Sequence, residues 1–196
     1  MLNSKLLAKI EEKDSITSSH CSKTSQYALK LGNTVGLNEE ELFLLEVSAK
    51  LHDVGKINVP DEILLKPTTL TIEEYEVIKN HSIWGAEIVN NFFSENEISE
   101  DVVALVRAIR HHHERFDGGG YPDGLKGDSI PYLSQIISVA DAYDAMTSDR
   151  TYRKAMEMEK AVEILKTESG KQFHPSLVEA FINLISPGIL RNSFAK

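Results

Sequence analysis

Apolar residues recur at every third or fourth position along almost the whole chain, and capping residues, glycines and prolines divide this pattern into segments. The first segment, Ser15 to Val35, ends at Gly36, and Asn38 begins a second segment that runs to Gly55. The alternation of a half-buried β-strand is missing, apart from short extended pieces such as Lys56 to Pro60. The pattern therefore predicts an all-α bundle.

The later segments carry their own start signals. Thr71-x-x-Glu74 is a capping box that opens the segment carrying His81, and Ser99 is placed to cap a helix that runs into three consecutive histidines. Further helices are expected over Pro131 to Met146, Glu157 to Ser169 and Pro175 to Ile185. Because no repeat or linker interrupts the pattern, residues 1–196 are expected to form one domain, with a core over about 15–155 and C-terminal helices over about 156–190.

Composition limits the partners and the metal chemistry. Cys21 is the only cysteine, which excludes an internal disulfide and a thiolate cluster, so histidines and carboxylates are left to bind any metal. The formal charge of −9 repels long nucleic acids. No segment has the apolar length of a membrane helix, and the first residues lack the pattern of a secretion signal. A cytoplasmic protein without nucleic-acid or membrane partners is expected.

The helix that leads into the histidine triplet orients its three members differently. An apolar stripe precedes them at spacings of three and four: Val102, Leu105, Val106 and Ile109. His112 and His113 extend this stripe, whereas His111 falls opposite its centre, where a solvated or supporting position is expected. Two adjacent inward histidines are costly to bury unless they are satisfied, and a metal ion would satisfy both.

The other candidates have simpler explanations when each is taken alone. His20 fits a hydrogen-bonded core histidine, the His52-Asp53 pair fits a helix end, and His81 by itself carries no signal. Asp141 lies in an apolar run where an unpaired carboxylate is costly, and Asp144 follows one turn later.

Taken together, these residues predict a metal centre. Mixed imidazole and carboxylate ligands favour iron, then manganese, over a structural zinc site. The groups are more numerous than one tetrahedral ion uses, so two divalent ions are predicted; such a pair activates water and screens the charge of a phosphate.

Five sequence blocks occur in order between His20 and Phe181: HDVGKINVPDEILLK, EEYEVIKNHSIWGAEIV, HHERFDGGGYPDGLKGDSIP, VADAYDAMTSDRTYRKA and GKQFHPSLVEAF. Through these blocks the chain resembles the HD-GYP subfamily of HD-domain metal-dependent phosphohydrolases. The resemblance implies an HD-domain helical bundle with extra C-terminal helices. It also implies hydrolysis of cyclic di-GMP to linear pGpG or to GMP.

The resemblance assigns roles by motif position. It implies the metal ligands His20, His52, Asp53, His81, His112, His113 and Asp141. Asp53 would bridge the two ions, and Lys56 would act beside the attacked phosphate. The substrate contacts implied are Gly120, Tyr121, Pro122, Arg150 and Arg153. Asp144 would support a metal ligand.

Neighbouring positions qualify this assignment. Some family members carry a glutamate for a third metal where this chain has Ile16, so two ions are expected. His174 replaces a usual aspartate and is expected to be structural, and Glu114 and Arg115 are expected to bind each other.

The resemblance also raises two protein partners: signalling proteins such as diguanylate cyclases, at the Gly-Tyr-Pro loop, and a second copy of the chain. Two alternatives to the cyclic di-GMP hydrolase stay open. One is a module that binds a cyclic dinucleotide with little catalysis. The other is a phosphohydrolase for another nucleotide, such as mixed cyclic GMP-AMP, a mononucleotide or an alarmone.

Overall fold

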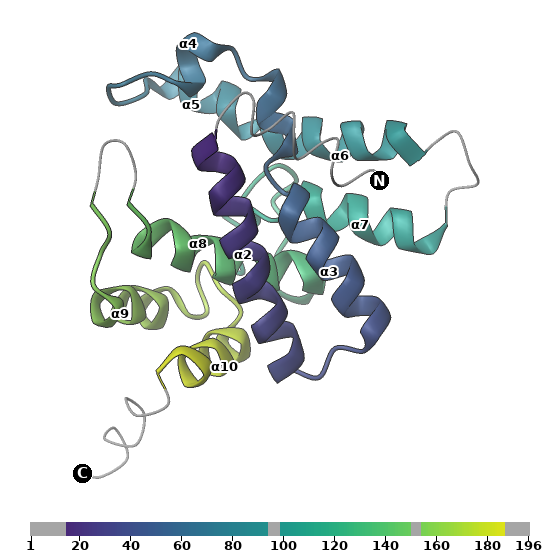
Figure 1. Cartoon of the computed structure of the whole chain (residues 1–196), viewed down its shortest axis with the longest axis vertical. Helices are drawn as coiled ribbons and strands as arrows, with labels where there is room; N and C mark the ends of the chain where they lie inside the picture. Colours follow the sequence, from purple (N-terminus) through teal and green to yellow (C-terminus); the bar gives the residue numbers. More distant parts are fainter. Residues whose placement is uncertain (1–14, 94–98, 150–153, 187–196) are drawn as a thin grey trace.

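The computed structural model describes residues 15–93, 99–149 and 154–186, which form an all-α structure (Figure 1). The longer helices are α2 (Ser15–Thr34), α3 (Glu39–Leu51), α6 (His81–Phe93), α7 (Glu100–Arg110), α8 (Tyr132–Thr147), α9 (Met158–Glu168) and α10 (Pro175–Ile185). Shorter elements are η1 (Val54–Asn58), α4 (Asp61–Leu64), α5 (Ile72–Lys79) and η2 (Gly127–Ser129). An isolated bridge between Ser169 and Phe173 is the one β-type pairing in these ranges. The all-α prediction is confirmed.

Side-chain caps form at the three positions that the sequence indicated. The Asn38 and Thr71 side chains accept hydrogen bonds from Glu41 N and Glu74 N. The side chains of these glutamates in turn accept hydrogen bonds from the backbone N of Asn38 and Thr71, which completes two capping boxes. Ser99 accepts from the backbone of the third residue of α7. These local contacts fix where three helices begin. None of the described helices is both long enough and apolar enough to span a membrane.

Two boundaries differ from the sequence expectation. The helix after Asn38 ends at Leu51 rather than at Gly55, and residues 54–58 form a 3-10 helix where an extended piece was expected. The reason is a close crossing: a Cβ on Gly55 would lie 1.9 Å from the His81 carbonyl oxygen at the start of α6. The tight turn therefore serves tertiary packing, which local sequence patterns do not report.

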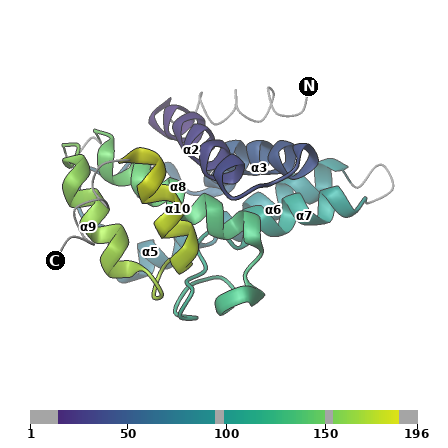
Figure 2. The same cartoon turned by 90° about the horizontal axis from the view of Figure 1, so that it is seen from below.

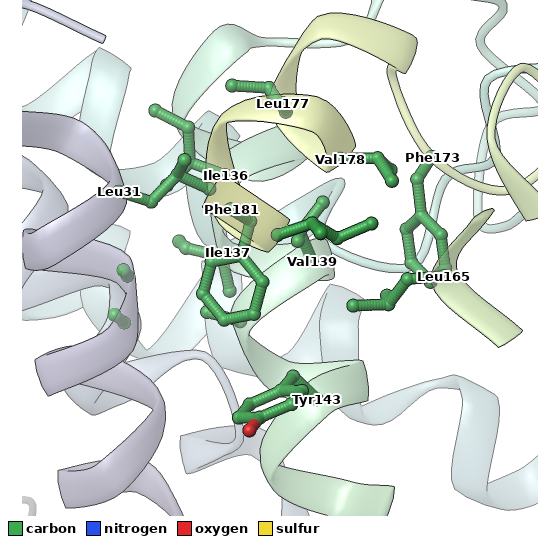
Figure 3. Packing of buried hydrophobic residues seen from close by; sticks show 14 of the residues in the cluster. Leu31, Ile136, Ile137, Val139, Tyr143, Leu165, Phe173, Leu177, Val178 and Phe181 are labelled. Carbon is green, nitrogen blue, oxygen red and sulfur yellow. The ribbon is translucent and has the colours of Figure 1, made fainter. Parts of the chain in front are cut away.

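Helix α2 lies between two groups of helices (Figures 1 and 2). On one side it packs against α8 and α10, and α9 lies beyond them; on the other side it packs against α3, which contacts α7, and α7 contacts α6. The larger apolar cluster fills the first side and extends to α3 through Leu45 and Ala49. Within it the Phe181 ring meets the Tyr143 ring edge to face (Figure 3), and it contacts the Tyr27 ring in the same way. A smaller cluster fills the second side and consists of Leu51, Val54, Val89, Leu105 and Ile109.

The candidate site residues lie next to both clusters. His52 and Asp53 fall between Leu51 and Val54 of the smaller cluster, and Asp141 directly follows Ala140 of the larger one. The backbone on either side of these polar residues is therefore anchored by packed apolar side chains.

Candidate metal centre

Seven side chains that the sequence singled out lie together in the structure. They are His20, His52, Asp53, His81, His112, His113 and Asp141. Helix α2, the turn after α3, the start of α6, the end of α7 and helix α8 supply them. The site is therefore built at the ends and inner faces of helices that are far apart in sequence.

The donors form two groups, and within each group the ligand atoms lie within 4.8 Å of one another: His81, His112 and His113, and His20, His52 and Asp141. Asp53 lies between the groups. Its Oδ1 is 3.3 Å from His81 Nε2, and its Oδ2 is 3.4 Å from His52 Nε2. One carboxylate thus faces a histidine of each group, as a bridge between two cations requires.

Three of the histidines are oriented by the helix that each one follows. His52, His81 and His112 donate from Nδ1 to the carbonyl oxygens of Ala49, Ile78 and Ile109, at 2.8, 2.7 and 2.6 Å. Each acceptor lies in the last turn of a helix, where carbonyl groups lack an intrahelical partner. Each imidazole caps the end of its helix, and this hydrogen bond fixes the ring proton on Nδ1. The unprotonated Nε2 is then left with a lone pair that can bind a metal ion.

The Nε2 atoms are placed where a cation fits. His52 Nε2 is buried and has no hydrogen-bond partner within the described part of the chain. His81 Nε2 and His112 Nε2 are 3.2 Å apart. Because Nδ1 carries the proton in both rings, two lone pairs face each other, and they repel unless a cation lies between them. Imidazole and carboxylate donors suit borderline divalent ions, so these residues fit a metal.

Burial keeps the first group neutral, as metal ligation requires. It lowers the pKa of His81 to about 3 and that of His113 to about 4, and it lowers the pKa of His112 well below the usual value. These three imidazoles are uncharged at neutral pH.

His20 lies between two carboxylates. Burial alone would lower its pKa, but the contacts of Nε2 with Asp141 at 2.8 Å and of Nδ1 with Asp144 at 2.5 Å raise it to about 9. A metal on Nε2 would replace the proton there, while Nδ1 would still donate to Asp144. Asp144 therefore has the supporting position that was expected, because its carboxylate orients the His20 ring.

We expect the stability of the metal-free protein to fall as the pH drops from about 6.5 toward 4. The folded pKa values of His81 and His113, about 3 and about 4, lie below the unfolded value, so unfolding takes up protons in this window. The contribution of these two histidines to the free energy of unfolding is complete above their unfolded pKa. It is lost as the pH falls toward and through their folded pKa values. His20 is protonated in both states here and does not offset the loss.

The measurement is thermal unfolding of chelator-treated protein between pH 4 and 7, where Tm should fall by roughly 5–10 °C. The variant His81→Gln should show a shallower dependence. A Tm that is independent of pH in this range would contradict the assignment of neutral buried imidazoles.

Lys56 lies beside the centre and contacts Asp53, with Nζ 2.7 Å from Oδ2. Burial alone would lower the pKa of Lys56, but the Asp53 charge raises it above the usual value, so the ammonium is retained at neutral pH. Lys56 thus provides a positive charge that is fixed beside the candidate metal ligands by its contact with Asp53.

Cys21 also belongs to this neighbourhood, which the sequence argument about cysteine did not anticipate. Its Sγ lies within 4.8 Å of the donor atoms of His52 and Asp53. Burial raises the pKa of the Cys21 thiol well above its usual value, so the sulfur is neutral here. No local signal marks this contact, because Cys21 simply follows His20 on α2.

The loop of residues 117–122, called the GYP loop below, folds back on the residues that follow α7. A Cβ on Gly120 would lie 2.3 Å from Arg115 N, so this glycine allows a close approach within the protein, and Gly118 supplies the positive φ of +87°. The Tyr121 ring then lies 4.9 Å from the His113 ring, with the Tyr121-Pro122 peptide in the cis form. The loop therefore ends against a candidate metal donor, His113.

Glu114 holds the chain that follows this loop. It is only 3 % exposed, and its two carboxylate oxygens accept hydrogen bonds from Asp123 N at 2.8 Å and Leu125 N at 3.1 Å. The expected pairing of Glu114 with Arg115 is wrong: Arg115 binds Asp117 instead, with a second contact to Glu168. Two backbone amides of the chain after the loop occupy both carboxylate oxygens of Glu114, and Arg115 pairs with Asp117 and Glu168.

Replacing Glu114 by alanine should loosen residues 123–125. Hydrogen bonds to a charged acceptor contribute about 1.5–3 kcal/mol each, so the Asp123 and Leu125 amides should exchange with solvent at least about tenfold faster. Hydrogen exchange followed by NMR measures this. The Gly127 amide, which donates to Phe116 O, provides an internal control that should change little. Unchanged exchange at Asp123 and Leu125 would contradict the role of Glu114.

His111 and His174 lie outside the group of donors. His111 was expected in a solvated or a supporting position, and the solvated alternative is wrong. The residue is 7 % exposed, and its ring contacts Asp123 Oδ2 and Arg107 O at 2.9 Å each. His174 caps α10 by accepting from Ser176 N, which is a structural contact. Arg150 and Arg153 lie outside the described residues.

Known proteins share this sequence and fold. The family model of the HD domain matches residues 3–177. The chain is 42 % identical over 179 residues to the cyclic di-GMP phosphodiesterase response regulator RpfG of Xanthomonas campestris, and 38 % identical over 174 residues to a cyclic di-GMP phosphodiesterase of Thermotoga maritima. These matches cover 91 % and 89 % of this chain but 46 % of each relative, so the chain spans slightly less than half of their length.

A third relative, the 3'3'-cGAMP-specific phosphodiesterase 2 of Vibrio cholerae, is 33 % identical over 88 % of this chain and 32 % of its own length. Among solved structures, the HDG"Y"P protein Bd1817 of Bdellovibrio bacteriovorus matches with a TM-score of 0.68 at 20 % identity, over 86 % of this chain and 52 % of that one. The HD domain of the L. monocytogenes phosphodiesterase PgpH, in complex with cyclic-di-AMP, matches with a TM-score of 0.61 at 21 % identity, over 98 % of both chains. The structural matches establish a shared fold.

Proposed function

The chain belongs to the HD domain family and, within it, to the HD-GYP group, and from this we propose that it is a metal-dependent phosphodiesterase that hydrolyses cyclic di-GMP to pGpG or GMP. The observation that carries the proposal is the pair of donor groups on either side of Asp53, with the GYP loop against one of them. The relatives named as cyclic di-GMP phosphodiesterases support the choice of substrate.

HD-domain phosphohydrolases depend on divalent metal ions, and we propose that this chain holds two, iron before manganese. One ion would bind His81, His112 and His113, and the other His20, His52 and Asp141, with Asp53 shared between them. When bound, such ions supply positive charge for the phosphate oxygens and activate water for attack. The neutral Nε2 atoms and the unpartnered His52 Nε2 support this assignment.

The remaining proposed residues bind and orient the substrate. Lys56 keeps its proton beside Asp53, so it is placed to donate that proton to the leaving 3′-oxygen or to hold the attacked phosphate. Tyr121 and Pro122 would contact the nucleotide at the GYP loop, which Gly120 allows to lie close to His113. Arg150 and Arg153 are proposed to contact the second phosphate or a guanine by their place in the sequence motif.

The test is metal content and turnover of protein that is purified without oxygen. We expect two ions per chain and release of pGpG or GMP from cyclic di-GMP in the presence of Fe(II) or Mn(II). A fully metallated protein that binds cyclic di-GMP for hours without product would favour the binding module instead.

The named relative that acts on 3'3'-cGAMP keeps the mixed ring as a second candidate substrate. A panel of cyclic di-GMP, cyclic GMP-AMP, a mononucleotide and an alarmone discriminates. The proposal requires the highest kcat/KM for cyclic di-GMP.

A further inference from the structure

Helix α5 contributes a cation and an aromatic ring to the edge of the GYP loop. Lys79 Nζ lies over two rings, 5.6 Å from the centroid of Tyr121 and 5.8 Å from that of Tyr75. Tyr75 is one turn before Lys79 on α5 and hydrogen-bonds Tyr121 through its side chain. The Tyr75 ring is 49 % exposed, so the cluster opens to solvent. No role in the reaction has so far been given to Tyr75 or Lys79.

This cluster is joined directly to the metal donors. The Tyr121 ring lies 4.9 Å from the His113 ring, and the backbone N of Tyr121 donates to His113 O at 3.3 Å. His81, two residues after Lys79, is a donor of the same group. The Tyr121 ring thus lies between Lys79 and His113, so Lys79 is separated from the donor groups by one side chain.

Lys79 is available to an anionic ligand. Its nearest acid is Glu76, at 2.7 Å and one turn back on the same helix, and the side chain of that acid is 58 % exposed. The Lys79 side chain is itself 26 % exposed, so the weak member of this pair is the glutamate, which solvent reaches and which can give way to another anion. Lys56 differs, because its partner Asp53 is 3 % exposed and belongs to the donor set. A phosphate beside Tyr121 would therefore find in Lys79 an ammonium that gives up only a weak contact.

We propose that Lys79 binds the phosphate of the cyclic dinucleotide that is not hydrolysed, and so contributes to the recognition of two-phosphate substrates. This inference rests on the proposed function. A cyclic dinucleotide carries two phosphodiesters in one ring, and while one lies at the metal donors the other must project from them. The Tyr121 and Tyr75 rings support the lysine stem and hold its ammonium above the GYP loop.

The test compares two substrates on the manganese-loaded full chain. Cyclic di-GMP carries the second phosphate, whereas bis-p-nitrophenyl phosphate has a single phosphodiester and offers Lys79 no second phosphate. Lys79→Gln should raise KM for cyclic di-GMP about tenfold, as expected for one lost charge-assisted hydrogen bond, with kcat changed less than about twofold. KM for bis-p-nitrophenyl phosphate should stay the same. Lys79→Arg should restore most of the loss.

Lys30 provides a matched control, because its Nζ also lies over a tyrosine ring, 5.9 Å from the Tyr27 centroid, at a site ten residues along α2 from His20. Lys30→Gln should leave both substrates unaffected. If Lys79→Gln raised KM equally for both substrates, or for neither, the inference would be overturned and the proposed function would stand. A wild-type protein that cleaves bis-p-nitrophenyl phosphate but not cyclic di-GMP would overturn both.

Discussion

Replacing Asp53 by asparagine is expected to lower kcat for cyclic di-GMP by about 1,000-fold and to reduce the bound metal below two ions per chain. Asp53 is 2 % exposed and faces both groups, with an oxygen 3.3 Å from His81 Nε2 and another 3.4 Å from His52 Nε2. The amide keeps the shape of the side chain but has no negative charge to share between two cations. It also leaves the Lys56 ammonium without its carboxylate.

The measurement combines elemental analysis of anaerobically purified protein with turnover at saturating substrate. Asp128→Asn is the matched control, because the Asp128 side chain is 95 % exposed and lies outside the donor groups. If Asp53→Asn retained two ions and turned over within about tenfold of the wild type, the bridging role would be wrong.

The variant Gly55→Ala should destabilise the metal-free protein by about 3 kcal/mol, which corresponds to a Tm lower by roughly 10 °C. The added methyl group would lie 1.9 Å from the His81 carbonyl oxygen and 2.5 Å from Gly85 N, and both are backbone atoms that cannot rotate away. Either η1 or the start of α6 must move; Asp53 directly precedes η1, and His81 is the first residue of α6. Metal affinity should fall together with stability.

Gly85→Ala tests the same crossing from the other side. Its methyl group would approach Ile109 Cγ2 at 3.2 Å and Gly55 N at 3.3 Å, contacts that require a shift of only a few tenths of an ångström. Alanine is also the better helix former by about 1 kcal/mol, so the net change should stay within about 1 kcal/mol of zero. Chemical denaturation of both variants measures the difference, and equal stabilities would contradict the close crossing at Gly55.

Much of the helical structure follows from local sequence. The capping signals at Asn38, Thr71 and Ser99 form as expected, because a cap depends on residues within three positions of each other. Helical phase also separates His112 from His111: the former joins the donors, whereas the latter contacts Asp123. His20, His52, His81 and Asp141 carry no local signal when each is taken alone; the set as a whole predicted a metal centre, and the resemblance then assigned each of them as a ligand.

The features that sequence reasoning missed are tertiary. The 3-10 turn at 54–58 exists because Gly55 meets α6, and the place of Cys21 beside His52 depends on how α2 packs against α3. The partner of Arg115 was misassigned because two backbone amides nine and eleven positions after Glu114 bind that glutamate. Each miss involves a contact between residues that lie apart in the sequence, so no short window could report it.

The three imidazoles that cap their own helix ends have a consequence for metal uptake. Since Ala49, Ile78 and Ile109 fix the rings of His52, His81 and His112 through bonds within three residues, each ligand is oriented by its own helix and not by the ion. An arriving ion meets donor atoms that already point inward, and little conformational entropy is lost on capture. Loading of the proposed site would then require the release of the His20 proton, while the rings of His52, His81 and His112 would already be oriented.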